Sequence, residues 1–280
     1  MSSALPEALG IIAGKGAYPR VLAQSARLQG VKRLFAVAFK GETDRELARH
    51  VDEVKWVHIG QLGALIEAFR ASGVKHAVMA GQITPTHLFR LRLDRAMIDL
   101  LGRLQQRNAE TIFGAVGEEL AKVGVELQAA SLFMESTMPA PGLLSRRAPT
   151  HEEEADIALG LQVAKLTSGL DIGQTVVVKQ GTILAVEAFE GTDATILRAG
   201  ELGGPGAVVV KVAKRGHDMR FDIPVVGAHT LKILVKAGVA VLAVEAGRTI
   251  LLEREKLVEE ANRRGLCFTA VATADAGATG

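Results

Sequence analysis

The sequence predicts an α/β protein in two parts: a Rossmann-like, parallel-sheet domain at residues 1–133 and a second, mixed α/β domain at residues 151–280. In the first part, short apolar runs alternate with helical stretches, which is typical of a parallel sheet covered on both faces. A Pro-containing stretch at residues 134–150 has neither helical nor strand periodicity and is expected to be a linker. A length of 280 residues is enough for two domains with separate cores.

The N-terminal domain is expected to place its strands and helices in alternation. Strand-like apolar runs lie at residues 8–13, 34–39, 54–59, 76–80 and 126–130. Helical patterns lie from Pro19 to about Gln29 and at residues 43–50, 61–71 and 94–121, the last with a break near Asn108. Parallel strands need such crossover connections, so the order of elements indicates a Rossmann-like sheet.

The first strand ends in Gly14-Lys15-Gly16, before a helix. Two glycines let backbone approach a ligand closely, and a helix N-terminus attracts an anion. A complete dinucleotide-binding fingerprint is missing, because Pro19 stands where the third glycine is expected. Gly14, Lys15 and Gly16 are therefore candidates for substrate binding, and a tight turn without a ligand explains them equally well.

A second candidate loop follows the fourth strand, at Gly81-Gln82. Loops at the carboxyl ends of parallel strands are where such sheets bind ligands. Gly81 and Gln82 are predicted to contact substrate, together with Thr84; the alternative is that the threonines nearby only cap a turn.

The second domain opens with a helix at about 151–168. Thr150 and Glu153 have the spacing of a capping box, so the acidic residues at this helix start are explained structurally. A hairpin around Gln180-Gly181 follows, then a helix from Thr192 and a strand at 207–212. The later elements are a helix from about His229, a strand at 239–244, a helix from Glu253 and a strand at 266–272.

Two polar stretches of this domain, residues 187–193 and 211–224, bring carboxylates and fixed cations together within a few positions. Chemistry on a charged, oxygen-rich group needs this arrangement, because carboxylates hold a hard cation and Arg or Lys neutralises phosphate. We expect the second domain to be the catalytic one.

Four carboxylates are candidate ligands of Mg²⁺ (or Mn²⁺). Asp218 and Asp222, four residues apart in a loop that ends at Pro224, are the first choice, as metal ligands or as the base that orients water. Glu190 and Asp193 are the second pair. For Asp193, a favourable charge at a helix N-terminus is an equally good explanation.

The cations beside them are Lys211, Lys214, Arg215 and Arg220. Lys211 and Lys214, with Thr192, are predicted to bind substrate. Arg220 lies between the two aspartates and is a candidate catalytic residue that clamps phosphate, or else a structural bridge between them. His217 can move a proton near neutral pH, although a lone loop histidine is more often a surface hydrogen-bonding group.

Composition excludes several classes of protein. A net charge of +2, with 4% aromatic residues, does not suit nucleic-acid binding. One cysteine, Cys267, in an apolar run, rules out a disulfide framework within the chain. Neither a secretory signal nor an apolar stretch of about 18 residues is present, so we expect a cytoplasmic protein. Zinc-protease and nucleophile-elbow motifs are also missing.

Four segments resemble one family. DIGQTVVVKQGTILAVEAFEGTD at 171–193 and VVVKVAKRGHDMRFDIPVVG at 208–227 are similar to the signature blocks of the LpxI-type UDP-2,3-diacylglucosamine pyrophosphatases, lipid A enzymes of Gram-negative bacteria. LGIIAGKGAYP at 9–19 and VMAGQI at 78–83 resemble the same family in the same order. This family commonly has glutamine where the chain has His217, which leaves the role of that position open.

The resemblance implies hydrolysis of UDP-2,3-diacylglucosamine to UMP and 2,3-diacylglucosamine 1-phosphate (lipid X). It makes UDP-2,3-diacylglucosamine and lipid X the small-molecule partners, and leaves a peripheral contact with the inner membrane and a homodimer open. Two other classes also stay open. A nicotinamide-dependent oxidoreductase would need an acidic residue where the second strand ends in Phe39-Lys40-Gly41. A non-catalytic nucleotide-sugar or lipid sensor would bind ligand without turnover.

Overall fold

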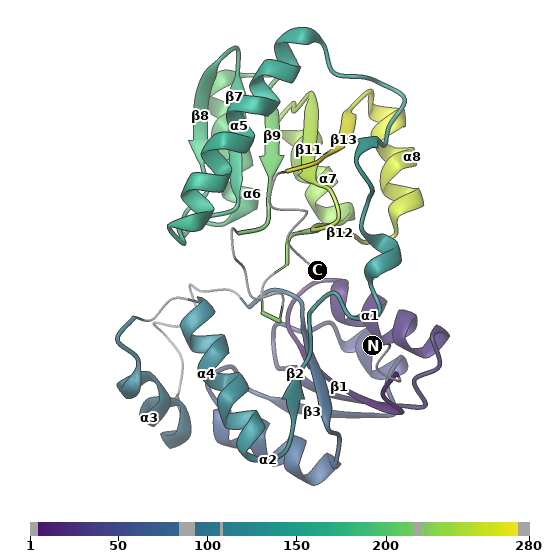
Figure 1. The fold of residues 1–280 in the computed structure, drawn as a ribbon, viewed down its shortest axis with the longest axis vertical. Helices are drawn as coiled ribbons and strands as arrows, with labels where there is room; N and C mark the ends of the chain where they lie inside the picture. The colour runs from purple at the N-terminus through teal and green to yellow at the C-terminus, as the bar shows by residue number, and fades with distance from the viewer. Residues whose placement is uncertain (1–4, 84–92, 107–108, 215–219, 222, 274–280) are drawn as a thin grey trace. The chain divides into compact units, whose positions relative to one another are not determined.

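The computed structural model describes residues 5–83, 93–106, 109–214, 220–221 and 223–273 (Figure 1). These residues divide into two compact units. The first unit contains the described residues up to Met134 together with Arg220 and Phe221, and the second contains the rest. Whether the units fold independently, with residues 134–150 as a linker, stays a prediction.

The first unit is built on a parallel sheet with strand order β3-β2-β1-β4-β5. Its strands are β1 (Ala8–Ala13), β2 (Arg33–Phe39), β3 (Glu53–Val57), β4 (His76–Ala80) and β5 (Glu126–Leu127). This order confirms the Rossmann-like prediction, because the connection reverses direction between β1 and β4 and sets their carboxyl ends side by side.

Three helices of the first unit share one apolar core with this sheet: α2 (Leu62–Ser72), α3 (Arg95–Arg103) and α4 (Ala109–Lys122). Helix α1 (Tyr18–Leu28) contributes no residue to that core and contacts β1 and β4 instead. The helix expected at 43–50 is only a 3-10 turn, η1 (Arg45–Arg49). Thr43 explains the difference, since its hydroxyl accepts from the Phe39 N–H and donates to the Ala13 carbonyl, which ties the chain to the sheet before a helix can start.

The second unit is built on a mixed sheet with order β6-β13-β11-β9-β7-β8, as predicted for a mixed α/β domain. Its strands are β6 (Gly142–Leu143), β7 (Thr175–Lys179), β8 (Thr182–Val186), β9 (Val208–Lys211), β11 (Val241–Glu245) and β13 (Cys267–Val271). Strands β9, β11 and β13 run parallel, whereas β7 is antiparallel to both β8 and β9. The predicted hairpin is confirmed, with Gln180 at φ 49° and Gly181 at φ 72° in its turn.

Two short features were not predicted. Strand β6 lies within the segment expected to be a linker and pairs with β13 across Gly142 and Leu143. Strands β10 (Val225–Val226) and β12 (Ile250–Leu251) form a separate parallel pair. A strand of two residues has no measurable alternation, so only its tertiary pairing reveals it.

Helices cover both faces of the second sheet. Helix α5 (His151–Gly169) covers one face, and α6 (Thr192–Gly203), α7 (Ala228–Lys236) and α8 (Arg254–Arg264) cover the other. Gly160 lets α5 approach closely, because an added Cβ would lie 2.5 Å from Val210 Cγ2. The predicted capping box is confirmed: Glu153 N–H donates to Thr150 Oγ1, and Thr150 N–H to Glu153 Oε2. Within the part of the chain that the structure describes, no helix is both long and apolar enough to cross a lipid bilayer.

Candidate functional site

The two glycine loops of the first unit contact each other at the carboxyl edge of its sheet. Lys15 N–H donates to the Gln82 carbonyl at 2.7 Å, and Gln82 N–H donates to the Lys15 carbonyl at 3.1 Å. A Cβ at Gly14 would lie 2.6 Å from Gln82 O, and one at Gly81 would lie 2.7 Å from Lys15 O. Close packing of the two loops therefore accounts for both glycines. Gly16, at φ +93°, has open space around its Cβ position. Substrate binding by all five residues stays a prediction.

In the second unit, polar residues gather at the edge where β8, β9, β11 and β13 end. Because β7 runs antiparallel to β9, its first residue, Thr175, pairs with Lys211, the last residue of β9. Glu187 follows β8 directly, and its N–H donates to the Thr175 carbonyl at 2.9 Å. Thr192 begins α6. Three separate connections thus bring one ammonium, two hydroxyls and one carboxylate to the same edge, where α/β sheets bind ligands.

These four residues, Thr175, Glu187, Thr192 and Lys211, form the Lys211 cluster. Lys211 is only 8% exposed, and its Nζ donates to Thr192 Oγ1 at 2.9 Å and to Thr175 Oγ1 at 3.4 Å. Thr192 Oγ1 in turn donates to Glu187 Oε1 at 2.9 Å. Among the residues that the structure describes, the buried Lys211 ammonium is therefore connected to a carboxylate through a hydroxyl group.

The second oxygen of Glu187 is available for a further interaction. Glu187 Oε2 is buried and has no hydrogen-bond partner among the described residues. Leaving a buried acceptor unpaired costs about 1–3 kcal/mol, so such atoms in folded proteins need an explanation. A proton donor on a bound ligand or on water would satisfy this oxygen. Glu187 is not among the residues predicted from sequence, although its place directly after a strand, at the edge with Lys211, is a signal that could have found it.

Helix α6 adds backbone donors beside this cluster. Its N-cap is Gly191, at φ 82°, and no side chain caps the helix N-terminus. The first N–H groups of a helix have no partner within it and favour anionic oxygens. Together with the buried Lys211 ammonium, they make this edge suitable for binding phosphate.

Glu190 and Asp193, the second predicted carboxylate pair, are both engaged by protein groups. Glu190 Oε1 accepts from Arg198 at 2.7 Å and from Thr195 at 3.3 Å, while Oε2 accepts from Ala188 N–H at 3.2 Å. A hydrogen bond from its own backbone N–H first, and then those from Arg198 and Thr195, hold the pKa of Glu190 below its ordinary value. Asp193 Oδ2 lies 2.7 Å from His229 Nε2. A metal-binding role for this pair stays a prediction.

The other predicted cations lie in two places. Lys214 Nζ is 3.4 Å from Asp171 Oδ1, in a pair that is mostly buried. Arg220 places its guanidinium carbon 4.8 Å from the centroid of the Phe221 ring. Phe221 packs against the core of the first unit, 3.7 Å from the Cβ position of Gly117, and Ile223, in the second unit, is 6% exposed.

Several predicted residues lie outside the described residues, and their roles stay predictions. They are Thr84, Arg215, His217, Asp218 and Asp222. Among the residues that the structure does describe, no group of three or more His, Cys, Asp or Glu side chains could hold a metal ion.

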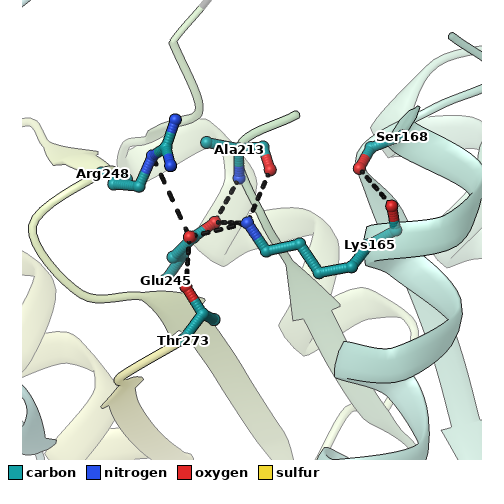
Figure 2. A network of polar contacts seen from close by, with 6 residues as sticks. All are labelled: Lys165, Ser168, Ala213, Glu245, Arg248 and Thr273. Atoms are coloured by element: carbon teal, nitrogen blue, oxygen red, sulfur yellow. Dashed lines mark hydrogen bonds and ion pairs between the residues drawn. The ribbon is translucent and has the colours of Figure 1, made fainter. Parts of the chain in front are cut away.

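A buried ion pair at the same edge of the second sheet was also missed by the sequence analysis (Figure 2). Glu245, the last residue of β11, is fully buried and pairs with Lys165 of α5 at 2.7 Å. Thr273 donates to Glu245 Oε1 at 2.6 Å, and Arg248 Nε lies 4.0 Å from that oxygen. The signal in the sequence was Glu245 itself, a single carboxylate at the last position of an otherwise apolar strand.

Comparisons with known proteins cover nearly the whole chain. The family model described as the LpxI N-terminal domain matches residues 8–137, and the model described as the LpxI C-terminal domain matches residues 140–269. The UDP-2,3-diacylglucosamine pyrophosphatase LpxI of Caulobacter vibrioides is 34% identical over an aligned length of 273 residues, and the match covers 92% of this chain and 95% of that protein.

Similarity to solved structures is much weaker. The N5-carboxyaminoimidazole synthetase of Staphylococcus aureus, complexed with ADP, is 14% identical over 62% of this chain, with a TM-score of 0.25, and the chain spans 38% of that protein. The biotin carboxylase domain of the Hydrogenobacter thermophilus 2-oxoglutarate carboxylase is 11% identical over 71% of this chain and 41% of its own length, with a TM-score of 0.29. At these TM-scores the similarity bears on neither fold nor function.

Proposed function

This chain belongs to the LpxI family, and we propose that it hydrolyses the pyrophosphate of UDP-2,3-diacylglucosamine to UMP and lipid X in lipid A biosynthesis. The family models and a relative named for this activity support the proposal from sequence. The structural observation that carries it is the Lys211 cluster, a buried cation at the ligand-binding edge of the second sheet, next to an uncapped helix N-terminus.

A pyrophosphate carries dense negative charge, and its hydrolysis requires that this charge be neutralised. Lys211 Nζ has only neutral hydroxyl oxygens as its described partners, and the Glu187 carboxylate reaches it through Thr192. We infer that a phosphate oxygen binds Lys211 and Thr192, with Lys214 close by along the chain as a second cation. Because Arg is suited to forked phosphate recognition, Arg220 is the third proposed cation.

Hydrolysis also needs an oriented water molecule and an acceptor for its proton. The water oxygen forms a new bond to phosphorus while the bridging P–O bond breaks, and attack at either phosphorus yields UMP and lipid X. We propose Asp222 as the carboxylate that orients this water, with Asp218 as its neighbour. Their spacing and the Pro224 that follows support this assignment.

A divalent cation, Mg²⁺ or Mn²⁺, is part of the proposal. Since the described residues contain no complete ligand group, and Glu190 and Asp193 are engaged by Arg198 and His229, the assignment rests on Asp218 and Asp222. Two carboxylates suffice, because Mg²⁺ usually keeps several of its waters. When bound, the ion would supply further neutralisation of the pyrophosphate oxygens.

We further propose that the protein acts in the cytoplasm and contacts the inner membrane peripherally. The proposed substrate carries two acyl chains, and burial of each methylene contributes about 0.8 kcal/mol, so such a molecule partitions into bilayers. A homodimer stays a prediction.

Appearance of UMP from UDP-2,3-diacylglucosamine, incubated with purified protein and Mg²⁺, tests the proposed function. Stoichiometric UMP and lipid X are expected. Tight binding of the substrate without turnover would instead identify a nucleotide-sugar or lipid sensor. The oxidoreductase alternative has no support from the site, because β2 ends at Phe39 and is followed by Lys40 and Gly41, where an acidic ribose-binding residue would be needed.

A further inference from the structure

The buried Lys165–Glu245 ion pair holds one peptide unit of the chain, that of Ala213 (Figure 2). Ala213 N–H donates to Glu245 Oε2 at 2.8 Å, and the Ala213 carbonyl accepts from Lys165 Nζ at 3.1 Å. Lys165 Nζ also donates to both oxygens of Glu245, at 2.7 and 2.8 Å. Toward the described residues, the Lys165 ammonium thus donates two bonds to the carboxylate and one to the backbone.

Ala213 needs these side chains because the sheet no longer supplies it with partners. The ladders from β9 to its two neighbours both end at Lys211, which pairs with Val244 on β11 and Thr175 on β7. Val212 N–H still bonds to the Gln174 carbonyl at 3.0 Å. Ala213, fully buried, lies beyond the ladder, and buried backbone groups must be paired. The ion pair therefore replaces one rung of the sheet with side-chain hydrogen bonds.

Two proposed phosphate-binding cations lie on either side of this held peptide. Lys211 is two residues before Ala213 and donates within the Lys211 cluster, and Lys214 is the next residue and pairs with Asp171. We infer that Lys165 and Glu245 are positioning residues, which fix the chain at Ala213 and thereby place Lys211 and Lys214 for the pyrophosphate. This inference rests on the proposed function only in taking those two lysines as phosphate-binding groups.

Stability alone does not explain an ion pair at this position. Exchange of a buried ion pair for well-packed apolar residues is often neutral or stabilising, because the charges lose their hydration. Apolar side chains cannot form hydrogen bonds with both the N–H and the C=O of one peptide, as Glu245 and Lys165 do here. The pair is thus suited to fixing where the strand ends and the next segment starts.

Two double variants of equal charge test this inference. In Lys165→Met/Glu245→Gln, the amide oxygen can still accept from Ala213 N–H, and Arg248, which lies 4.0 Å from the Glu245 carboxylate, loses that charge in both double variants alike. In Lys165→Met/Glu245→Met, that acceptor is lost. We expect the Gln variant, which keeps only the bond to Ala213 N–H, to raise KM for UDP-2,3-diacylglucosamine by about threefold, and the Met variant, which loses both bonds, to raise it by about tenfold or more, with kcat less affected.

A single variant, Glu245→Asp, tests the same inference if Lys165→Met/Glu245→Met does not fold. It keeps the charge facing Lys165 but withdraws the carboxylate by one methylene from Ala213 N–H. A rise in KM of about tenfold is expected here as well. Calorimetric titration with inorganic pyrophosphate gives a readout that does not depend on turnover, and its Kd should rise in parallel.

The control is the ion pair at the opposite edge of the same sheet. Arg147 Nη2 lies 2.6 Å from Glu153 Oε1, and Arg147 Nη1 donates to the Ala240 carbonyl, just before β11, at 3.3 Å. Arg147→Met/Glu153→Gln should lower Tm without changing KM. If the parent is active and KM is equal in the parent, in Lys165→Met/Glu245→Met and in Glu245→Asp, the inference is wrong. An equal rise of KM in the Arg147→Met/Glu153→Gln control would also overturn it. An inactive parent would instead refute the proposed function.

Discussion

Lys211 Nζ donates to Thr192 Oγ1 at 2.9 Å, although 19 positions separate the two residues in the chain. The same Thr192 hydroxyl donates to Glu187 Oε1, so that a buried ammonium and a carboxylate share one hydroxyl group. The antiparallel step from β7 to β9 places Thr175 beside Lys211, and the bond from Glu187 N–H to the Thr175 carbonyl brings the segment before α6 to the same edge. The predictions that follow depend first on this cluster.

Removal of the Lys211 ammonium should weaken substrate binding and turnover. For Lys211→Met we expect kcat/KM to fall at least about tenfold, since hydrogen bonds to a charged group contribute about 1.5–3 kcal/mol. Lys179→Met is the matched control, because Lys179, at the far end of β7, bonds to the carbonyls of Gly203 and Pro205. Steady-state kinetics on both variants checks this, and equal losses in the two would contradict it.

Thr192→Val removes the shared hydroxyl while keeping the shape of the side chain. Both Lys211 and Glu187 then lose a partner, so the free energy of unfolding should fall by about 1–3 kcal/mol and kcat/KM should fall with it. Thr192→Ser should restore most of both. Urea unfolding measures the first quantity, and Thr167→Val, which removes a hydroxyl bonded within α5, serves as the control. Activity lost equally in the Ser variant would show that the hydroxyl is not what matters.

Asp222→Ala should lower kcat by at least about two decades, which corresponds to roughly 3 kcal/mol of transition-state stabilisation. The fold should survive, since Phe221 and Ile223 on either side provide the apolar anchors. Asp218→Ala should show a similar but smaller loss. Kinetics and thermal melting are to be measured together. Near-normal turnover with a much lower Tm would make Asp222 a structural partner of Arg220.

Activity should depend on a hard divalent cation, because hard cations prefer oxygen ligands and the proposed ligands are carboxylates. Excess EDTA should abolish UMP release, and Mg²⁺ or Mn²⁺ should restore it. Binding of Mn²⁺, followed by its paramagnetic signal, should weaken in Asp222→Ala and persist in Lys179→Met. Full turnover in excess EDTA would contradict the metal proposal. The phosphate-binding role proposed for the Lys211 cluster would still stand.

Glu153 should make the free energy of unfolding depend on pH. Burial raises its pKa, but hydrogen bonds from Arg147 and Thr150 outweigh that effect, so the pKa in the folded protein lies below the ordinary value of 4.5. A depressed pKa stabilises the fold fully above the ordinary value, and the contribution is lost as pH falls through the folded value. The stability difference between parent and Glu153→Gln should therefore be largest near neutral pH and shrink below about pH 4.5.

Urea unfolding at several pH values checks this, with Glu152→Gln in the same helical turn as the control. A difference between parent and Glu153→Gln that stays constant down to strong acid would show that the Glu153 charge does not contribute.

The sequence by itself determined the elements whose signals are local. Apolar periodicity located β1, β2 and β4, and a Thr150–Glu153 capping box located the start of α5. Gln180-Gly181 located the hairpin, because only residues that tolerate positive φ suit such a turn. The same local reading placed Lys211 and Thr192 among the candidate residues but not in contact.

Only the tertiary structure decided the features that depend on distant partners. The 3-10 turn η1 replaces a helix because Thr43 bonds back to the end of β1, and β6 exists only through its pairing with β13. Glu187 and Glu245 became candidates once the sheet brought them to one edge, where Lys165 and Glu245 meet across 80 positions of sequence. A carboxylate's partners are set by strand order and register, which no local pattern encodes.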